Sequence, residues 1–423
     1  MQLSLRTDRQ LIRASTHSTR YLMVSLTAPA APPRAGRLPV NVGIVLDRSG
    51  SMAGERKFML ARAAVEQSLC MLHPEDRFTL VVYDEEVSTL VPATFASSEA
   101  RGLAMRRLAE VEPRGCTDLH AGWNTAATQL ADHLAKESVN RVLLLTDGLA
   151  NHGVTDHIAL VSHAGELRRR GIATTTFGVG ADFDERLLRD ISHEGGGQFY
   201  FIETPAQIAD LLTSELGEAL EVVRRDVALQ IALPAGAEAE PLNRYRFTHV
   251  AGDNELRVDL GDLTSGQELC VVIRIRFPRG ENGTTTETRV SIAGADALAL
   301  DERASLTWSY ASHADNDGQS RDRVVDREVA RLYVTRARAE ATEANRNGDF
   351  ERARRVLDGT ASRIHGYTFG DPGLQRLRQL LRAEMRDYTS GPMSAMALKS
   401  AFFVAESAGK NRGPEGKARR ARP

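Results

Sequence analysis

Two uninterrupted apolar runs, LPVNVGIVL at residues 38–46 and RVLLLT at residues 141–146, constrain the fold more than any other feature of the chain. Runs of this kind are typical of strands that are buried on both faces of a sheet. Helical patterns alternate with further short apolar segments as far as residue 220. Strands that are separated by helices join through crossovers, which produce a mainly parallel sheet with helices on both faces. We therefore expect a doubly wound α/β domain.

The expected elements of this domain alternate along the chain. Strands are predicted at residues 38–46, 77–83, 87–91, 141–146, 172–179 and 198–202, and helices at residues 57–72, 98–110, 119–136, 158–170, 183–192 and 205–220. The segment 87–91 follows the strand before it too closely for a crossover connection. It is therefore predicted to be an antiparallel edge strand.

The pattern changes after about residue 220. Strand-like segments at residues 227–233, 255–260, 268–277, 286–292 and 304–310 are broken by Gly, Pro and Asn, without helices between them. This arrangement is typical of an antiparallel β-sandwich. The first 30 residues also contain a strand pattern, at residues 21–26, and are expected to complete the sandwich. The α/β domain would then be inserted in a discontinuous β domain.

From about residue 315 the chain is helical and charged. The turn Asn347-Gly348-Asp349 separates predicted helices at residues 327–345 and 350–357, an antiparallel pair that resembles a single tetratricopeptide-like hairpin. One hairpin is only a weak indication of a peptide-binding array, which needs several repeats. The basic end at residues 409–423 is poor in apolar side chains and is expected to be disordered.

Composition restricts the classes of partner. The chain carries 54 basic and 56 acidic side chains, so nothing in its charge points to nucleic acid or to an anionic membrane. The cysteines Cys70, Cys116 and Cys270 form no CxxC pair, which is typical of reduced thiols in a cytosol. The first residues lack an apolar core of signal-peptide length, and no run of about 18 apolar residues occurs. We expect a cytoplasmic protein.

Oxygen-bearing side chains gather in three short motifs. DRSGS at residues 47–51 follows the first buried strand, GCTD at 115–118 precedes the third helix, and TDG at 146–148 follows the strand RVLLLT. In an open α/β sheet, ligands bind beyond the carboxyl ends of the strands, and all three motifs belong to that edge. The candidate ligands are two carboxylates and three hydroxyls: Asp47, Ser49, Ser51, Thr117 and Asp147.

These five side chains favour a hard cation such as Mg²⁺, Ca²⁺ or Mn²⁺, because they offer only oxygen ligands. Gly50 lets the backbone bend between the two serines. Two carboxylates offset the charge of a divalent cation, but hydroxyls are weak neutral ligands. We therefore expect the cation to keep an open position for an external carboxylate.

The motifs resemble the metal-ion-dependent adhesion site (MIDAS) of the von Willebrand factor A (VWA) family, which consists of Asp-x-Ser-x-Ser, a separate Thr and a separate Asp. The resemblance covers about residues 39–216, and VLDRSGSM followed by LLLTDG is highly specific in that order. It implies a Rossmann-like fold in which Ser49, Ser51 and Thr117 bind the metal directly, whereas Asp47 and Asp147 act largely through bound water. Cys116 departs from the pattern, because the family often has Gly there, but no ligand is lost.

The resemblance extends to the flanking regions, which are similar to those of bacterial cytosolic VWA proteins. Some of these are labelled as relatives of calcium-activated chloride channels, a label that does not imply a channel here because no spanning segment occurs. The expected division is residues 1–37 as N-terminal strands, 38–220 as the VWA domain, 221–313 as the β-sandwich, 314–408 as the helical region and 409–423 as the tail.

The function expected from the residues and the resemblance is non-enzymatic binding. A Mg²⁺ ion, or Ca²⁺ or Mn²⁺, would bind an Asp or Glu side chain of a partner protein. Related bacterial domains often act beside AAA+ ATPases, which makes such ATPases candidate partners by analogy. One alternative is a scaffold in which the metal is purely structural, and another is a metal-dependent phosphatase. A phosphatase of the haloacid-dehalogenase type, with Asp47 as its nucleophile, would require a second acid two residues further on. Ser49 stands at that position.

Simpler interpretations exist for several motifs. Asp-x-Ser-x-Ser alone also occurs at helix N-caps. The acidic run Asp84-Glu85-Glu86 is better interpreted as a solvated hairpin turn than as a second metal site. The histidines His152, His157 and His163 lack the paired spacing of a zinc site. The glycines at residues 195–197 follow a helix and precede a strand, which is the wrong order for a phosphate loop.

Overall fold

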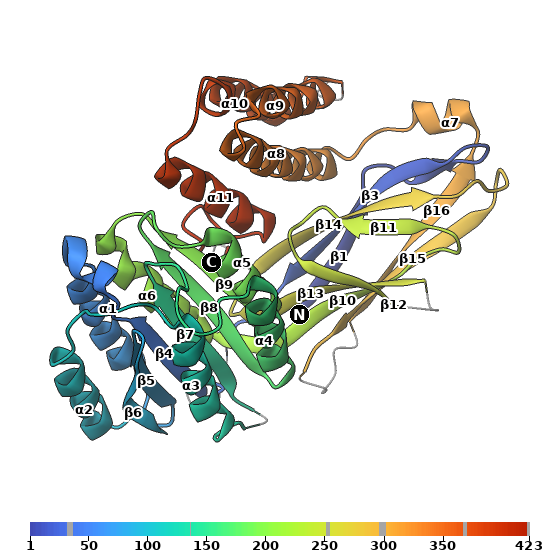
Figure 1. Ribbon diagram of the computed structural model, residues 1–423. Coiled ribbons are helices and arrows are strands. Elements are labelled where there is room, and N and C mark those ends of the chain that lie inside the picture. The colour runs from blue at the N-terminus through green and yellow to red at the C-terminus, as the bar shows by residue number, and fades with distance from the viewer. Residues whose placement is uncertain (32–36, 136, 251–253, 296–301, 367–369, 421–423) are drawn as a thin grey trace. The chain divides into compact units, whose positions relative to one another are not determined.

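The computed structural model describes residues 1–31, 37–135, 137–250, 254–295, 302–366 and 370–420, and the chain divides into two compact units (Figure 1). One unit is formed by Ala30–Val223, and the other combines Met1–Pro29 with Arg224–Pro423. The first unit is therefore inserted in the second.

The inserted unit contains a six-stranded sheet in the order β6-β5-β4-β7-β8-β9. Its strands are β4 (Val40–Asp47), β5 (Arg77–Tyr83), β6 (Val87–Phe95), β7 (Val139–Thr146), β8 (Ile172–Val179) and β9 (Gly196–Ile202). All neighbours are parallel except β6, which pairs antiparallel with β5 at the edge, as predicted. Strands β4 and β7 are buried along their whole length, which explains their uninterrupted apolar runs.

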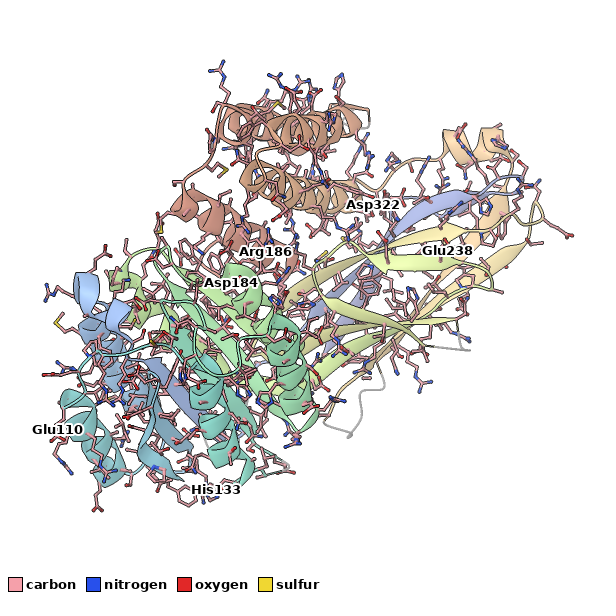
Figure 2. The ribbon with its side chains drawn as sticks, viewed as in Figure 1. Glu110, His133, Asp184, Arg186, Glu238 and Asp322 are labelled. Carbon is pink, nitrogen blue, oxygen red and sulfur yellow. The ribbon has the colours of Figure 1, made fainter. Side chains whose placement is uncertain are left out.

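Helices connect these strands or follow the last of them. They are η2 (Gly50–Arg56), α1 (Lys57–Met71), α2 (Ser98–Ala109), α3 (Leu119–Ala131), α4 (His157–Arg169), α5 (Glu185–Glu194), η3 (Pro205–Gln207) and α6 (Ile208–Leu220). Helix α1 packs against α6, α3 packs on β4 and β5, and α5 packs on β8 and β9. Three helices begin at an aspartate that accepts a backbone N–H, namely Asp118, Asp156 and Asp184, of which Asp184 is labelled in Figure 2.

The second unit contains two further sheets. One has the order β1-β3-β14-β11, and the other has the order β12-β13-β10-β15-β16-β2. Their strands are β1 (Gln2–Thr7), β2 (Leu11–Arg13), β3 (Ser18–Thr27), β10 (Val222–Ala232), β11 (Glu238–Pro241), β12 (Arg246–Val250), β13 (Glu255–Thr264), β14 (Glu268–Phe277), β15 (Thr285–Ala293) and β16 (Arg303–Ala311). The rings of Phe277 and Trp308 meet between the sheets, with centroids 4.8 Å apart.

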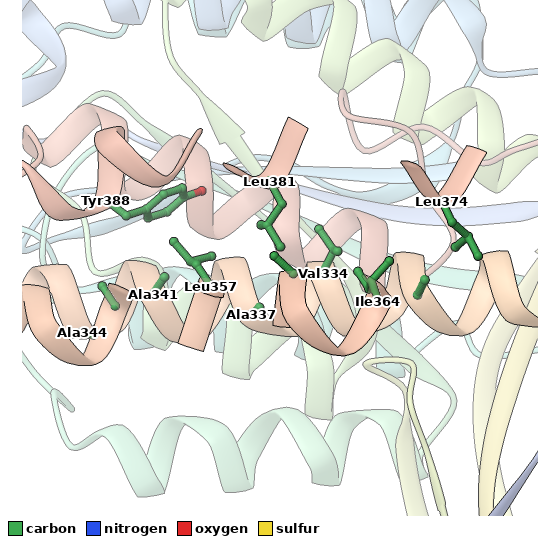
Figure 3. Close-up of a cluster of buried hydrophobic side chains, with 12 residues drawn as sticks. Val334, Ala337, Ala341, Ala344, Leu357, Ile364, Leu374, Leu381 and Tyr388 are labelled. Carbon is green, nitrogen blue, oxygen red and sulfur yellow. The ribbon is translucent and has the colours of Figure 1, made fainter. Parts of the chain in front are cut away.

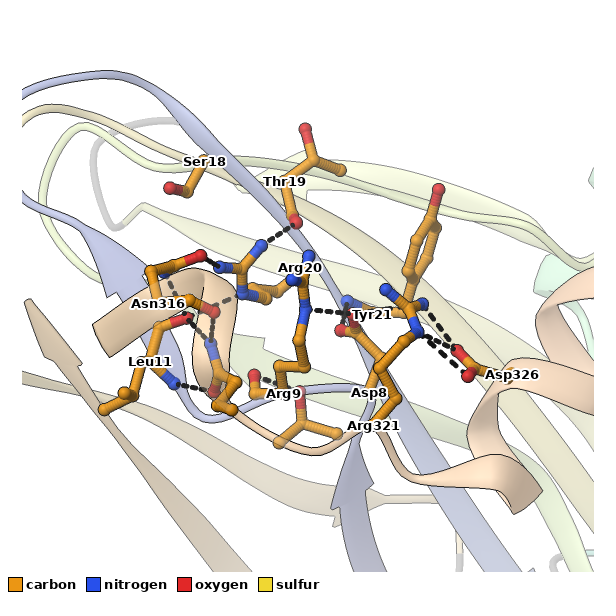
Figure 4. A network of polar contacts seen from close by, with 12 residues as sticks. Asp8, Arg9, Leu11, Ser18, Thr19, Arg20, Tyr21, Asn316, Arg321 and Asp326 are labelled. Carbon is orange, nitrogen blue, oxygen red and sulfur yellow. Dashed lines mark hydrogen bonds and ion pairs between the residues drawn. The ribbon is translucent and has the colours of Figure 1, made fainter. Parts of the chain in front are cut away.

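The N-terminal strands belong to this sandwich, because β3 pairs antiparallel with β14 over its whole length. The pairing of β2 with β16 is parallel, so the sandwich is not entirely antiparallel. Polar contacts also join the N-terminal strands to the helical region (Figure 4). Buried Asp8 pairs with Arg321 at 3.6 Å, and Arg20 donates a 3.0 Å hydrogen bond to the side chain of Asn316.

The helical region consists of α7 (His313–Gly318), α8 (Arg323–Arg346), α9 (Phe350–His365), α10 (Pro372–Thr389) and α11 (Ala395–Gly409). Helices α8 and α9 form the predicted hairpin, in which Gly348 has a φ of 74°. Leu357, Leu374 and Leu381 belong to the apolar cluster that holds α8, α9 and α10 together (Figure 3). A second cluster joins Val325, Val329 and Leu332 of α8 to the sheet that contains β3 and β14.

The expectation of a disordered basic tail is wrong for residues 410–420. The Lys410 carbonyl accepts a 2.8 Å hydrogen bond from the Tyr245 hydroxyl, and the Glu268 amide donates a 2.9 Å hydrogen bond to the Arg419 carbonyl. Asn411 and Arg412 are buried. Contacts with distant residues order this polar segment, and its own composition does not reveal them. Residues 421–423 lie outside the described residues.

Among the described residues, no helix combines the length and the apolar character that are needed to cross a bilayer.

Candidate metal site

The three oxygen-bearing motifs meet at the carboxyl edge of the parallel sheet. Asp47 is the last residue of β4, and Asp147 follows the last residue of the neighbouring strand β7. Backbone hydrogen bonds join the loops: the Gly50 amide donates to the Gly115 carbonyl at 3.1 Å, and the Asn151 amide donates to the Thr117 carbonyl at 3.2 Å. The motifs are therefore held together by the backbone as well as by their side chains.

Hydrogen bonds connect four of the five candidate ligands, Asp47, Ser49, Ser51 and Asp147. The Oγ atoms of Ser49 and Ser51 are 3.1 Å apart, and Ser51 Oγ donates to Asp147 Oδ1 at 2.6 Å. Asp47 accepts from the Ser49 amide at 2.7 Å and from Thr146 Oγ1 at 2.6 Å. Both carboxylates are fully buried.

Thr117, the fifth candidate, lies beside Gly148, as Ser51 does. A methyl group at Gly148 would lie 3.6 Å from Ser51 Oγ and 3.6 Å from Thr117 Oγ1. The absence of a side chain at Gly148 thus leaves open the space beside both hydroxyls. All five residues that the sequence singled out are gathered at one place.

The electrostatics of this cluster suit a cation. Burial raises the pKa of Asp47 to about 6, despite hydrogen bonds from Ser49 and Thr146 that lower it, and nearby Asp147 raises it further. The Tyr83 hydroxyl is also buried, and burial and the Asp47 carboxylate raise the pKa of Tyr83. Two buried carboxylates beside three hydroxyls form an oxygen-only set that fits a hard divalent cation.

Lys57 is a member of the site that sequence reasoning missed. It is the first residue of α1, and its Nζ atom lies 2.7 Å from Oδ2 of Asp147. The Lys57 side chain is 11% exposed. A lysine at a helix N-terminus is unfavourable, because the helix dipole places positive charge there. The positive charge at this unfavourable place is the local signal by which the sequence could have indicated that Lys57 belongs to the site.

The burial of Asp84 corrects the expectation that residues 84–86 form a solvated turn. The 84–86 segment does form the turn between β5 and β6, but the Asp84 side chain is fully buried and not solvated. Its carboxylate pairs with Arg48 at 3.1 Å and with Arg114 at 2.8 Å. Burial alone would raise the pKa of Asp84, but the Glu86 amide and the two guanidinium groups hold it below its usual value.

Asp84 and its neighbour Glu85 hold the loop that carries Thr117. The Asp118 amide donates to the Asp84 carbonyl at 2.8 Å, and the Cys116 amide donates to the Glu85 carboxylate. Cys116 itself is exposed, and its thiol is free, as are those of Cys70 and Cys270. The acidic turn therefore positions a candidate ligand.

The other motifs are accounted for without a metal. His157 pairs with Asp190 at 2.9 Å, and the His163 ring packs against Trp123 with centroids 4.9 Å apart. Within the described ranges, no three His, Cys, Asp or Glu side chains could hold a metal ion. The glycines at residues 195–197 connect α5 to β9.

Residues 41–214 match the family model of the von Willebrand factor type A domain, and this part of the chain is a VWA domain. Two solved structures are similar over most of the chain. They are a von Willebrand factor type A protein from Catenulispora acidiphila (TM-score 0.70, 18% identity, 89% of each chain) and the ArnB paralog VWA2 from Sulfolobus acidocaldarius (TM-score 0.61, 16% identity, 96% of this chain and 98% of that one).

Relatives in sequence cover less of the chain. Escherichia coli YfbK is 28% identical over 281 residues, which are 64% of this chain and 48% of YfbK. Human inter-alpha-trypsin inhibitor heavy chain H4 is 30% identical over 174 residues, which are 40% of this chain and 18% of that protein. The matched residues thus span about half of YfbK and less than a fifth of H4.

Proposed function

We propose that the VWA domain is a protein-binding module that depends on a divalent cation. Asp47, Ser49, Ser51, Thr117 and Asp147 would hold Mg²⁺, or Ca²⁺ or Mn²⁺, and an Asp or Glu side chain of a partner protein would complete the coordination. The cation would supply a positive point of attachment for that carboxylate, and the protein itself would perform no reaction.

The observation that carries the proposal is the convergence of oxygen atoms around Gly148. Ser51 Oγ and Thr117 Oγ1 both face the space where a side chain of Gly148 would stand, and Ser51 donates to buried Asp147. Hydroxyls from two separate loops meet there, beside carboxylates whose burial favours a compensating charge. A capping role for the serines would not require Thr117 or Asp147 at this place.

Metal binding is the first step to test. The full chain, freed of metal with EDTA, would be titrated with Mg²⁺ and Mn²⁺ by calorimetry, beside Asp47→Ala and a control at the exposed residue Asp132, Asp132→Ala. We expect the wild type and the control to bind one cation and Asp47→Ala to lose binding while remaining folded by circular dichroism. Equal metal binding by Asp47→Ala would contradict the proposal.

Partner binding is the second step. Proteins captured from the native cell in Mg²⁺ should be released by EDTA and should be absent with Asp47→Ala. AAA+ ATPases are the first candidates to examine by direct binding with purified protein. A partner that binds equally well in EDTA would favour a scaffold with a structural metal, and hydrolysis of a phosphate ester that Asp47→Asn abolishes would favour the phosphatase.

A further inference from the structure

The side chain of Lys57 reaches into the proposed metal site from the start of α1. Asp147 has two carboxylate oxygens, and they have different partners: Oδ1 accepts from Ser51 at 2.6 Å, and Oδ2 pairs with Lys57 Nζ at 2.7 Å. Asp147 is fully buried, and Lys57 is 11% exposed. The ammonium group is therefore the charge partner of a candidate metal ligand.

The backbone before Lys57 adopts an uncommon conformation. Glu55 and Arg56 have φ values of 52° and 61°, in the left-handed region that side chains other than glycine rarely occupy. Gly180, which directly follows β8, lies beside the lysine: a methyl group there would be in ordinary van der Waals contact with Nζ, at 3.8 Å. Two unfavourable features, this backbone and a cation at a helix N-terminus, accompany the contact with Asp147.

We propose that Lys57 is an internal counter-cation of the metal site, an inference that rests on the proposed function. Before a cation binds, Lys57 offsets one of the two carboxylate charges of Asp47 and Asp147. After a divalent cation binds, the two carboxylates and the lysine together leave the site with one net positive charge. Without Lys57 the loaded site would be neutral.

Lys57 would affect the affinity for the cation and the affinity for an external carboxylate in opposite directions. Lys57 repels the incoming cation and pairs with one of its ligands, so it weakens metal binding. The same positive charge strengthens the attraction of the loaded site for an external carboxylate. Lys57 thus makes cation binding weaker and capture of an acidic side chain stronger, which favours a site that is loaded firmly only when the partner is present.

The test compares Lys57→Met with Arg56→Gln in the full chain. Arg56 is exposed and adjacent, so Arg56→Gln removes the same formal charge without touching Asp147. Calorimetric titration with Mn²⁺ at fixed pH and salt should show a Kd at least about tenfold lower for Lys57→Met than for the wild type. Arg56→Gln should change the Kd by less than about twofold, because an exposed charge is screened.

Two further readouts separate this role from a merely structural one. The metal-free Tm of Lys57→Met should be lower than that of the wild type, and saturating Mn²⁺ should raise it by more than it raises the wild-type Tm. Acetate would also be titrated into the Mn²⁺-loaded protein, and the loss of metal-bound water would be measured from the relaxation rate of water protons. Acetate should displace this water several-fold less effectively in Lys57→Met than in the wild type. Lys57→Arg keeps the charge and should behave like the wild type in both assays.

The outcomes for the two proposals differ. If the wild type binds Mn²⁺ and Lys57→Met binds it with the same Kd, the counter-cation role is overturned and the proposed function stands. If only Lys57→Met binds Mn²⁺, the competition is supported and the proposed function of the native site fails. If neither binds, both proposals fail.

Discussion

The hydroxyl of Ser51 donates a 2.6 Å hydrogen bond to the carboxylate of Asp147, although 96 positions separate the two residues. The contact exists because β4 and β7 are parallel neighbours in the sheet, so the loops that follow them begin side by side. The strands β5 and β6 and the helices η2, α1, α2 and α3 lie between the two strands in the sequence. The candidate metal site is thus a product of strand order.

Gly148→Ala should separate metal binding from folding. The added methyl group would lie 3.6 Å from Ser51 Oγ and from Thr117 Oγ1, which is ordinary van der Waals contact, so the fold should tolerate it. The free energy of unfolding should change by less than about 1 kcal/mol. The affinity for Mn²⁺ should fall at least about tenfold, because the methyl group fills the space between two ligands. Unchanged Mn²⁺ affinity in calorimetry would place the cation elsewhere.

Asp84→Ala should destabilise the loops around the site and lower the free energy of unfolding. It leaves the guanidinium of Arg48, which is 11% exposed, without the Asp84 carboxylate, and losing one partner of a buried pair costs about 3–5 kcal/mol of unfolding free energy. Urea denaturation measures this loss. Glu86→Ala is the matched control: Glu86 pairs with Arg114 at an exposed position, and such pairs contribute about 0–1 kcal/mol. Equal losses for the two variants would show that the burial of Asp84 is unimportant.

Glu215→Ala should strongly destabilise the α/β unit. Glu215 of α6 is fully buried. Its carboxylate accepts hydrogen bonds from Arg141 of β7 and Thr175 of β8, both at 2.8 Å, and from the Tyr200 hydroxyl of β9 at 2.7 Å. Its removal leaves a buried cation, which costs about 3–5 kcal/mol, measurable by urea denaturation. The double variant Arg141→Met/Glu215→Leu should recover part of that loss, since apolar replacement of both partners is often tolerated. A double variant less stable than Glu215→Ala would contradict this account.

Truncation after Gly409 should destabilise the unit that contains the β-sandwich. It removes the Lys410 carbonyl that accepts from the buried Tyr245 hydroxyl, and an unsatisfied buried hydroxyl costs about 1–3 kcal/mol. It also removes the Arg419 carbonyl that holds the Glu268 amide, so that amide should exchange its hydrogen faster.

Tyr245→Phe tests whether that hydroxyl contact explains the loss. In the full chain the substitution should destabilise, whereas in the truncated chain it should have little further effect, because the hydroxyl has already lost the Lys410 carbonyl. Additive losses in the two backgrounds would show that Lys410 and Tyr245 are not coupled.

His163 should make the folded state less stable in mild acid. Burial, and next the neighbouring His120, lower the pKa of His163 below its usual value of 6.5. The unfolded chain therefore takes up a proton more readily than the folded chain as the pH falls below 6.5. The contribution is fully present above that pH and is lost as the pH falls through the folded-state pKa. The urea midpoint should fall less between pH 7.5 and pH 5.5 in His163→Gln than in the wild type. An equal fall in both proteins would show that other groups cause the loss of stability in acid.

The local pattern of the sequence determined the elements of this protein and the chemistry of its candidate site. The apolar runs that became β4 and β7 could be recognised because a strand buried on both faces needs apolar side chains at every position. Oxygen-bearing residues directly after those strands indicated a hard-cation site, since parallel strands end at a common edge. These inferences depend only on neighbouring residues and on general rules of strand connection.

Only the tertiary structure decided which distant charges meet. The pairing of Lys57 with Asp147, the burial of Asp84 beneath Arg48 and Arg114, and the ordering of residues 410–420 each depend on contacts across many positions. A charged side chain looks the same in sequence whether it is solvated or buried with a partner. Its state depends on the free energy of burial and pairing, which is defined only once the strands and loops are in place.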